Sequence, residues 1–205
     1  RAFSEMPPPG SPWTYQAGIV RRVSAEVKAS VAGRQEQDTS YTCVVDRWGN
    51  AFSATPSDGW SESPFVPGLG LQMSARGSST WLDPEHPSSL QPWKRPRLTP
   101  NPAIAFKNGR LLMPFGTPGG DVQCSAMVQM FLNIVEFGMD PQKAIEQPRF
   151  APWNFPNSFW PHTYLPGRLE LEGRFPEHVV AELSRRGHDN RVLADWSRTM
   201  GGLSA

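Results

Sequence analysis

One threonine, Thr39, stands at the start of a segment whose composition is typical of a short β-strand, "TSYTCVVD". A threonine hydroxyl is a weak nucleophile unless a base removes its proton, and a threonine at a chain start carries such a base in its own α-amino group. The reference pKa of that amine, about 7.7–8.0, suits general-base catalysis at neutral pH. Taken alone, the local sequence favours a simpler interpretation, in which a β-branched residue begins a strand.

A second candidate feature is the glycine pair Gly119–Gly120 in "GTPGGD", directly before a segment with helical periodicity. Backbone N–H groups at the beginning of a helix lack helical partners, and the helix dipole adds partial positive charge there. Such a place stabilises a phosphate group or a developing oxyanion. Taken alone, the pair is better explained as a strand-to-helix turn that needs positive φ angles.

The composition of the 205-residue chain excludes several function classes. A formal net charge of +1 gives no electrostatic argument for binding nucleic acid or an anionic membrane. No apolar run approaches the roughly 20 residues that span a bilayer. The four histidines are scattered, and Cys43 and Cys124 have apolar neighbours, so we expect two buried thiols, no metal site and no cofactor.

The elements expected around these residues mix strands and helices, which predicts an α+β domain. Two hairpins are predicted, one with its turn at residues 46–50 and one around Asn108–Gly109. Residues 56–100 show little periodicity and are predicted to form a long loop that shapes a site. The remaining predictions are helices at 17–33, 122–138 (Asp121 as N-cap, with an apolar stripe of Cys124, Met127, Val128, Phe131, Ile134 and Val135), 140–147 (Asp140 as N-cap) and 176–187, and strands at 168–173 and 191–196.

Three segments resemble, in order, the small subunit of the γ-glutamyltranspeptidase family. They are "TSYTCVVDRWGNAFS", the stretch from "KRPRLTPNPAIAF" through "GTPGGD" to "AIEQPRF", and "LELEGRFPEHVVAELSRRGH". The resemblance covers most of residues 39–205. Its most specific parts are the threonine followed by "VVD" and "GNA", the "KRP" segment, and the "PGG" loop before a helix.

This resemblance implies an N-terminal nucleophile (Ntn) hydrolase, a four-layer αββα sandwich that is partial here because most of the large subunit is absent. Members are made as precursors that cleave themselves before the catalytic threonine, which implies a cleavage site between Asp38 and Thr39. Residues 1–38 then correspond to the tail of the large subunit, and residues 39–205 to a small-subunit-like catalytic domain. The implied partners are a small-molecule amide substrate and the large subunit of the same precursor.

The resemblance also implies roles for individual residues. Thr39 is the expected nucleophile, and Ser57 matches the hydroxyl residue that supports it. Gly119 and Gly120 match the pair whose N–H groups form the oxyanion hole. Thr99 falls at one of two adjacent serines that hold a substrate carboxylate, and the other serine is replaced by Leu98.

Three further departures from the family pattern bear on the substrate. Gly59 replaces an asparagine, Arg76 stands where the family has a glutamine or asparagine that contacts the acyl group, and Ser79 aligns with the acid that binds the glutamyl α-ammonium. A guanidinium can bind a carboxylate bidentately, so Arg76 favours a carboxylate-bearing acyl group, although it equally fits a solvated loop cation.

We therefore expect an amide hydrolase or acyl transferase of the acylase and amidohydrolase branch. One alternative is a true γ-glutamyl transferase or glutathione hydrolase. Another is a catalytically silent subunit or scaffold that keeps the fold. The sequence does not separate a periplasmic from a cytoplasmic location.

Overall fold

The computed structural model describes residues 39–58 and 65–205. The predicted helix at 17–33, together with Asp38 and Gly59, lies outside these described residues, so the predicted division of the chain at residue 39 stays a prediction. The chain forms two compact units. The larger unit comprises Thr39–Ser57, Pro100–Asn154 and Pro166–Ala205, and the described part of the smaller unit comprises Asp58, residues 65–99 and Phe155–Leu165.

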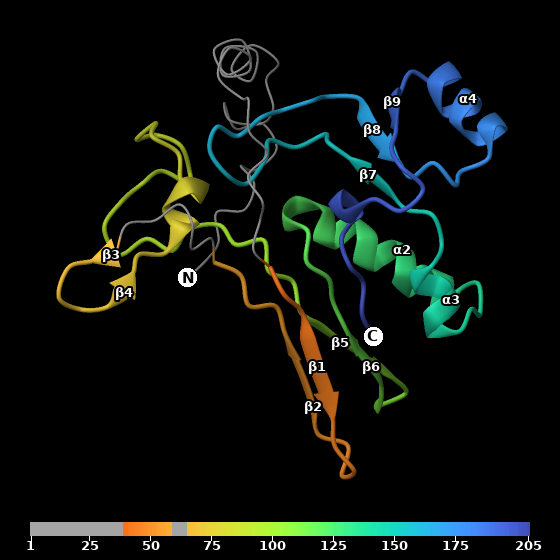
Figure 1. The fold of residues 1–205 in the computed structure, drawn as a ribbon, viewed down its shortest axis with the longest axis horizontal. Helices are drawn as coiled ribbons and strands as arrows, with labels where there is room; N and C mark the ends of the chain where they lie inside the picture. The colour runs from red at the N-terminus through yellow and green to blue at the C-terminus, as the bar shows by residue number, and fades with distance from the viewer. Residues whose placement is uncertain (1–38, 59–64) are drawn as a thin grey trace. The chain divides into compact units, whose positions relative to one another are not determined.

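Both predicted hairpins are confirmed in the larger unit (Figure 1). Strand β1 (Thr42–Val45) pairs antiparallel with β2 (Ala51–Ala54), and β5 (Ala103–Lys107) with β6 (Arg110–Phe115). In the first turn, the Asp46 carboxylate accepts hydrogen bonds of 2.9 Å from the backbone N–H groups of Trp48 and Asn50. An acidic side chain that bonds the backbone of the following residues is a common way to fix a tight turn.

The helix expected after the glycine pair is present as α2 (Gln123–Val135). A short 3₁₀ turn, η2 (Gly120–Val122), precedes it, so the predicted N-cap at Asp121 is wrong: the N-cap is Val122, which makes no side-chain capping bond. The tight turn places Asp121 inside regular structure before the α-helix begins. Helix α3 (Pro141–Ile145) has the predicted cap, since the Asp140 carboxylate accepts a bond from the N–H of Lys143 at 3.0 Å.

A three-stranded sheet completes the larger unit. Strand β8 (Arg168–Leu171) is its centre, antiparallel to β7 (Phe150–Pro152) and parallel to β9 (Asp189–Val192). Helix α4 (Glu177–Arg185) lies between β8 and β9 in the chain and makes the crossover that a parallel pair requires. Strand β7 was not predicted, and β9 begins two residues before the predicted strand.

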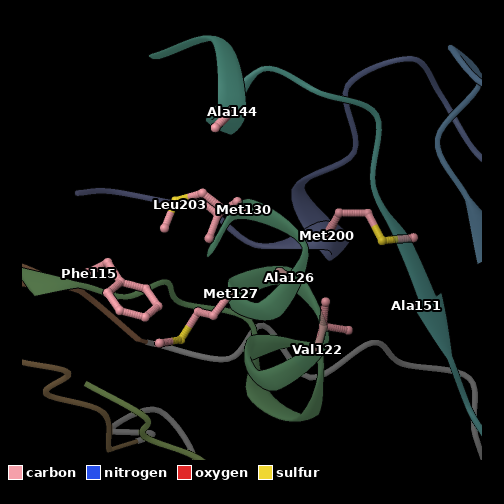
Figure 2. Close-up of a cluster of buried hydrophobic side chains, with 9 residues drawn as sticks. All are labelled: Phe115, Val122, Ala126, Met127, Met130, Ala144, Ala151, Met200 and Leu203. Carbon is pink, nitrogen blue, oxygen red and sulfur yellow. The ribbon is translucent and has the colours of Figure 1, made fainter. Parts of the chain in front are cut away.

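The hydrophobic core of the larger unit lies between α2 and the elements around it. Figure 2 shows the side chain of Met127 directed toward the ring of Phe115 on β6, and Met200 directed toward Ala151 on β7. The buried face of α2 is made by Ala126, Met127 and Met130. The fully buried members of this core are Phe115, Val122, Ala126, Met127, Met130, Ala144, Ala151, Met200 and Leu203.

Two sequence expectations about burial are wrong in part. The predicted apolar stripe of α2 includes Val128, which is exposed, and omits Met130, which is 1% exposed. Cys124 is exposed and Cys43 half-buried, so the expected pair of buried thiols is not found. Apolar residues cover a much wider arc of this helix than the face that packs, so periodicity alone could not identify that face.

The smaller unit has little regular structure in its described part, as the lack of periodicity indicated. It contains a two-residue hairpin, β3 (Phe65–Val66) with β4 (Leu71–Gln72), and a 3₁₀ helix, η1 (Ala75–Ser79). In the part of the chain that the structure describes, no helix is long and apolar enough to cross a membrane.

The core packing predicts the effect of shortening side chains on α2. Met130→Ala should lower the free energy of unfolding by roughly 2–5 kcal/mol, because the substitution removes transfer energy and leaves a cavity. Val128→Ala, on the same helix but 56% exposed, is the matched control and should change it little. Urea denaturation measures both; equal losses for the two variants would contradict this assignment of the packed face.

Candidate active site

Thr39 and Ser57 lie side by side in the larger unit. The Oγ1 atom of Thr39 is 2.7 Å from the Oγ atom of Ser57, a hydrogen bond in which either hydroxyl can donate. The two residues form an antiparallel bridge that extends the β1–β2 pairing, and the N–H of Ser40 donates to the carbonyl oxygen of Pro56 at 3.0 Å. The strand pairing therefore fixes the Ser57 hydroxyl against the predicted nucleophile, as a supporting group requires.

Gly119 and Gly120 lie where β6 leads into η2 and α2, in a segment of residues 116–120 that we call the glycine loop. Their φ angles are 131° and 58°, so both are in the region that favours glycine. The loop leads through η2 into the N-terminal end of a 13-residue helix, which contributes partial positive charge. Positive φ values, the helix end and the partial burial of the pair suit an oxyanion-binding turn.

Tyr41 connects these two features. Its ring lies so close to Gly116, the first residue of the glycine loop, that a Cβ atom added there would be 2.3 Å from ring carbons. The Tyr41 hydroxyl is 2.8 Å from the Oγ atom of Ser53, and burial raises the pKa of Tyr41 to about 12, so it stays protonated. Because Tyr41 is two residues from Thr39, this contact brings the segment that carries Thr39 against the glycine loop.

The residues predicted to bind substrate lie in the smaller unit. The guanidinium of Arg76 donates through Nη1 to the Oγ1 atom of Thr99 at 3.2 Å and lies over the ring of Phe159, 5.2 Å from its centroid. Arg76 is only 8% exposed. Burial lowers its pKa, and the Asp58 carboxylate opposes that change. A buried guanidinium of this kind contradicts the alternative of a solvated loop cation.

Ser79, on the same 3₁₀ helix as Arg76, is 1% exposed, and its Oγ atom has no hydrogen-bond partner among the described residues. A buried hydroxyl without a partner is costly, so such a group is a candidate for contact with a bound molecule. The structure thus brings Arg76 and Thr99 together and places Ser79 on the same turn.

The turn that holds Arg76 is fixed by local hydrogen bonds. The Asp58 carboxylate accepts from the N–H of Ala75 at 2.9 Å and from the hydroxyl of Ser74 at 3.1 Å, and that hydroxyl in turn accepts from the N–H of Arg76. Capping by Ser74 and Asp58 begins the 3₁₀ helix at a defined residue, which sets the direction in which Arg76 leaves the backbone.

Sequence reasoning missed the aromatic stack that supports this turn. The Trp81 ring stacks with the imidazoles of His86 and His162, with centroid distances of 4.3 and 4.2 Å. Burial, aided by the positive charge of His162 when protonated, lowers the pKa of His86 to about 4, and its Nδ1 atom accepts from the N–H of Ser88. The only sequence signal was the high aromatic and proline content of two loops far apart in the chain.

No group of three histidine, cysteine, aspartate or glutamate side chains that could hold a metal ion occurs among residues 39–58 and 65–205.

Comparison with known proteins places these features in a family. The family model for gamma-glutamyltranspeptidase matches residues 11–205. The chain is 34% identical over 175 residues to an oxamate amidohydrolase proenzyme of Klebsiella pneumoniae, covering 84% of this chain and 32% of that protein. It is 33% identical to the glutathione hydrolase-like YwrD proenzyme of Bacillus subtilis, covering 82% and 31%. The chain therefore spans about a third of the length of these curated relatives.

Solved structures show the same fold. The structure of LmbA2991HD is 41% identical, with a TM-score of 0.73, over 84% of this chain and 31% of that chain. A gamma-glutamyltranspeptidase mutant of Helicobacter pylori is 24% identical, with a TM-score of 0.63, over 80% of this chain and 87% of that chain. These neighbours confirm the predicted fold class, a partial Ntn-hydrolase fold of mixed helices and strands. The chain belongs to the γ-glutamyltranspeptidase family of Ntn hydrolases.

Proposed function

We propose that this chain carries the catalytic threonine of an amidohydrolase that forms an acyl-enzyme with Thr39. The observation that carries the proposal is the 2.7 Å contact between the hydroxyls of Thr39 and Ser57, in the same unit as the positive-φ pair Gly119–Gly120. Family membership supports it, and so do the names of the relatives, which are proenzymes of hydrolases. Cleavage between Asp38 and Thr39 would free the α-amine that the mechanism needs.

In the proposed reaction, the Thr39 oxygen forms a bond to the carbonyl carbon of a substrate amide, and its proton passes to the Thr39 α-amine. The carbonyl oxygen becomes an oxyanion, which the N–H groups of Gly119 and Gly120 stabilise. The C–N bond then breaks, the leaving amine takes the proton from the Thr39 ammonium, and an ester to Thr39 remains. Water attacks the ester by the same steps, releasing the acid and restoring Thr39.

The acyl group we favour bears a carboxylate of its own. Arg76, buried and hydrogen-bonded to Thr99, carries a planar guanidinium, a group whose fork geometry suits binding of a carboxylate. Ser79 adds a buried hydroxyl on the same turn. The oxamate named for one relative is an amide that carries a carboxylate, which is consistent with this substrate class.

A γ-glutamyl transferase or glutathione hydrolase is the second candidate, because several relatives are named as glutathione hydrolases or as glutathione hydrolase-like. A γ-glutamyl group adds an α-ammonium, which needs an anionic partner when it is buried. The position expected to supply that partner is Ser79, whose hydroxyl carries no charge, so this candidate is less well supported. A catalytically silent scaffold is disfavoured by the retained Thr39–Ser57 pair.

The proposed maturation can be tested in the full-length protein. We expect the wild type to split between Asp38 and Thr39, and the Thr39→Ala variant to stay intact, because it lacks the hydroxyl that attacks the preceding peptide bond. Thr42→Ala, at an exposed threonine on β1, is the matched control and should split normally. Intact mass and N-terminal sequencing give the result. An unsplit wild type with full activity would exclude a free Thr39 amine as the base.

A second test concerns the oxyanion hole. Gly119→Ala should reduce kcat by about 10²-fold with little change in KM, because stabilisation of developing negative charge is lost mainly in the transition state. Gly109→Ala is the control, since Gly109 also has a positive φ of 75° but no atom within 4 Å of the added Cβ. Steady-state kinetics on an acidic amide compares them, and equal kcat values for the two variants would argue against an oxyanion role.

A third test separates the two enzyme candidates through the acyl group. The mature wild type should hydrolyse a glutaryl anilide with a higher kcat/KM than a γ-glutamyl anilide. Arg76→Ala should remove most of that preference, Ser79→Asp should shift it toward the γ-glutamyl substrate, and Arg95→Ala, at an exposed arginine, should leave it unchanged. A wild type that prefers the γ-glutamyl anilide would instead favour the transferase or glutathione hydrolase.

A further inference from the structure

A C-terminal segment of the larger unit, residues 197–204, pairs with the glycine loop. Gly116 and Ser204 form an isolated antiparallel bridge and exchange backbone hydrogen bonds of 3.1 and 3.0 Å. Met200, within the segment, is fully buried in the core beside Ala151 (Figure 2). The segment is thus fixed by the core on one side and lies against the glycine loop on the other.

The contact between segment and loop is closest at Gly201, whose φ is 80°. A Cβ atom added to Gly201 would lie 2.5 Å from the Oγ1 atom of Thr117 and 2.7 Å from the carbonyl oxygen of Pro118. A Cβ atom added to Gly119 would lie 3.3 Å from the Cα atom of Gly201. A shift of this segment by a fraction of an ångström would therefore change the space available to the glycine pair.

Glu172, which directly follows β8, is hydrogen-bonded to the first residue of the segment. Its side chain is fully buried. One carboxylate oxygen accepts from the N–H of Ser197, the first residue of the segment, at 3.1 Å and from Nη2 of Arg149 at 3.4 Å. The other oxygen accepts from Nη2 of Arg174 at 2.6 Å and from the backbone N–H of Arg149 at 3.0 Å. Four donors from three separate stretches of chain therefore meet at one carboxylate.

Arg149 extends this network to the close contact. Its Nη1 atom donates to the carbonyl oxygen of Gly201 at 3.1 Å, while its Nη2 atom faces Glu172. The planar guanidinium thereby links a buried carboxylate to the residue that abuts the glycine loop. Burial lowers the pKa of Arg149, and the charge of Glu172 opposes that change.

We propose that Glu172 and Arg149 are positioning residues for the oxyanion hole, acting through the C-terminal segment on Gly119 and Gly120. The inference rests on the proposed function. This role requires no contact of either side chain with the substrate. The network holds the Gly201 backbone against the glycine loop, and so sets where the loop's N–H groups point. Catalysis is sensitive to such placement, since a displacement of about 1 Å at the reacting groups can reduce the rate by roughly 10²-fold.

The test compares three variants of the full-length protein. Glu172→Gln keeps the shape of the side chain and removes its charge, and Arg149→Lys keeps a positive charge beside Glu172 but cannot donate to both Glu172 and Gly201. Arg168→Gln is the matched control, because it breaks the 2.6 Å ion pair between Arg168 and Asp189 on the same sheet, away from the segment. We expect kcat to fall about 10- to 100-fold in the first two variants, with KM within about threefold of wild type.

A second measurement keeps the inference falsifiable without activity. Amide hydrogen exchange at Gly119 and Gly120 should be at least about tenfold faster in Arg149→Lys than in Arg168→Gln. Unchanged exchange at these two amides, or an equal fall in kcat for Arg168→Gln, would overturn the positioning role. Intact mass of the wild type incubated with an acidic amide tests the proposed function separately: if no acyl-Thr39 species forms, the proposed function is overturned. The hydrogen-exchange result alone then decides whether the network positions the glycine loop. If Glu172→Gln does not fold, Arg149→Lys decides.

Discussion

Close packing of backbone around the glycine loop is the constraint on which the candidate site depends. On one side the Tyr41 ring occupies the space that a side chain at Gly116 would need, and on the other Gly201 lies against Thr117 and Pro118. Any residue larger than glycine at position 116 or 201 would have to push its neighbours apart. Since Tyr41 follows Thr39 by two residues, the same contacts that shape the loop also hold the segment that carries the proposed nucleophile beside it.

This packing is stable because the elements on both sides of the loop are fixed by interactions of their own. Strand β6 leads into it after pairing with β5, and α2 leaves it with Ala126, Met127 and Met130 buried in the core. Helix α2 therefore has two roles: its buried face stabilises the unit, and its N-terminal end provides a favourable potential for negative charge next to Gly120. The same helix therefore contributes both to the hydrophobic core and to the electrostatic potential at the candidate site.

The sequence could predict those parts of the fold that depend on residues close together in the chain. The hairpin at Asn108–Gly109 and the Asp140 cap of α3 follow from residue types at fixed spacing, and both are present. The residues that we propose as catalytic could be identified only through family resemblance. The structure brings Thr39 next to Ser57, and Arg76 next to Thr99, by contacts that no local pattern contains.

Features that arise from long-range contacts could not be predicted in this way. Which face of α2 is buried depends on the positions of β6 and β7, and Val128 is therefore exposed although it fits a helical stripe. The stack of Trp81 with His86 and His162 joins residues 81 apart in the chain from the same unit, and neither loop has a period that would reveal it. The burial of Glu172 could not be predicted either, because a glutamate next to a strand is usually solvated.

The buried charges of the two units have different physical roles. In the larger unit, Glu172 is surrounded by protein donors, so its charge is satisfied by the chain itself and serves the architecture. In the smaller unit, burial lowers the pKa of Arg76, and the Asp58 carboxylate, which also caps the turn, opposes that change. A substrate carboxylate bound to Arg76 would act in the same direction as Asp58 and stabilise the charged guanidinium further. Desolvation of this cation therefore costs less when an anion lies beside it, and this is the physical basis on which we propose an acidic acyl group as its ligand.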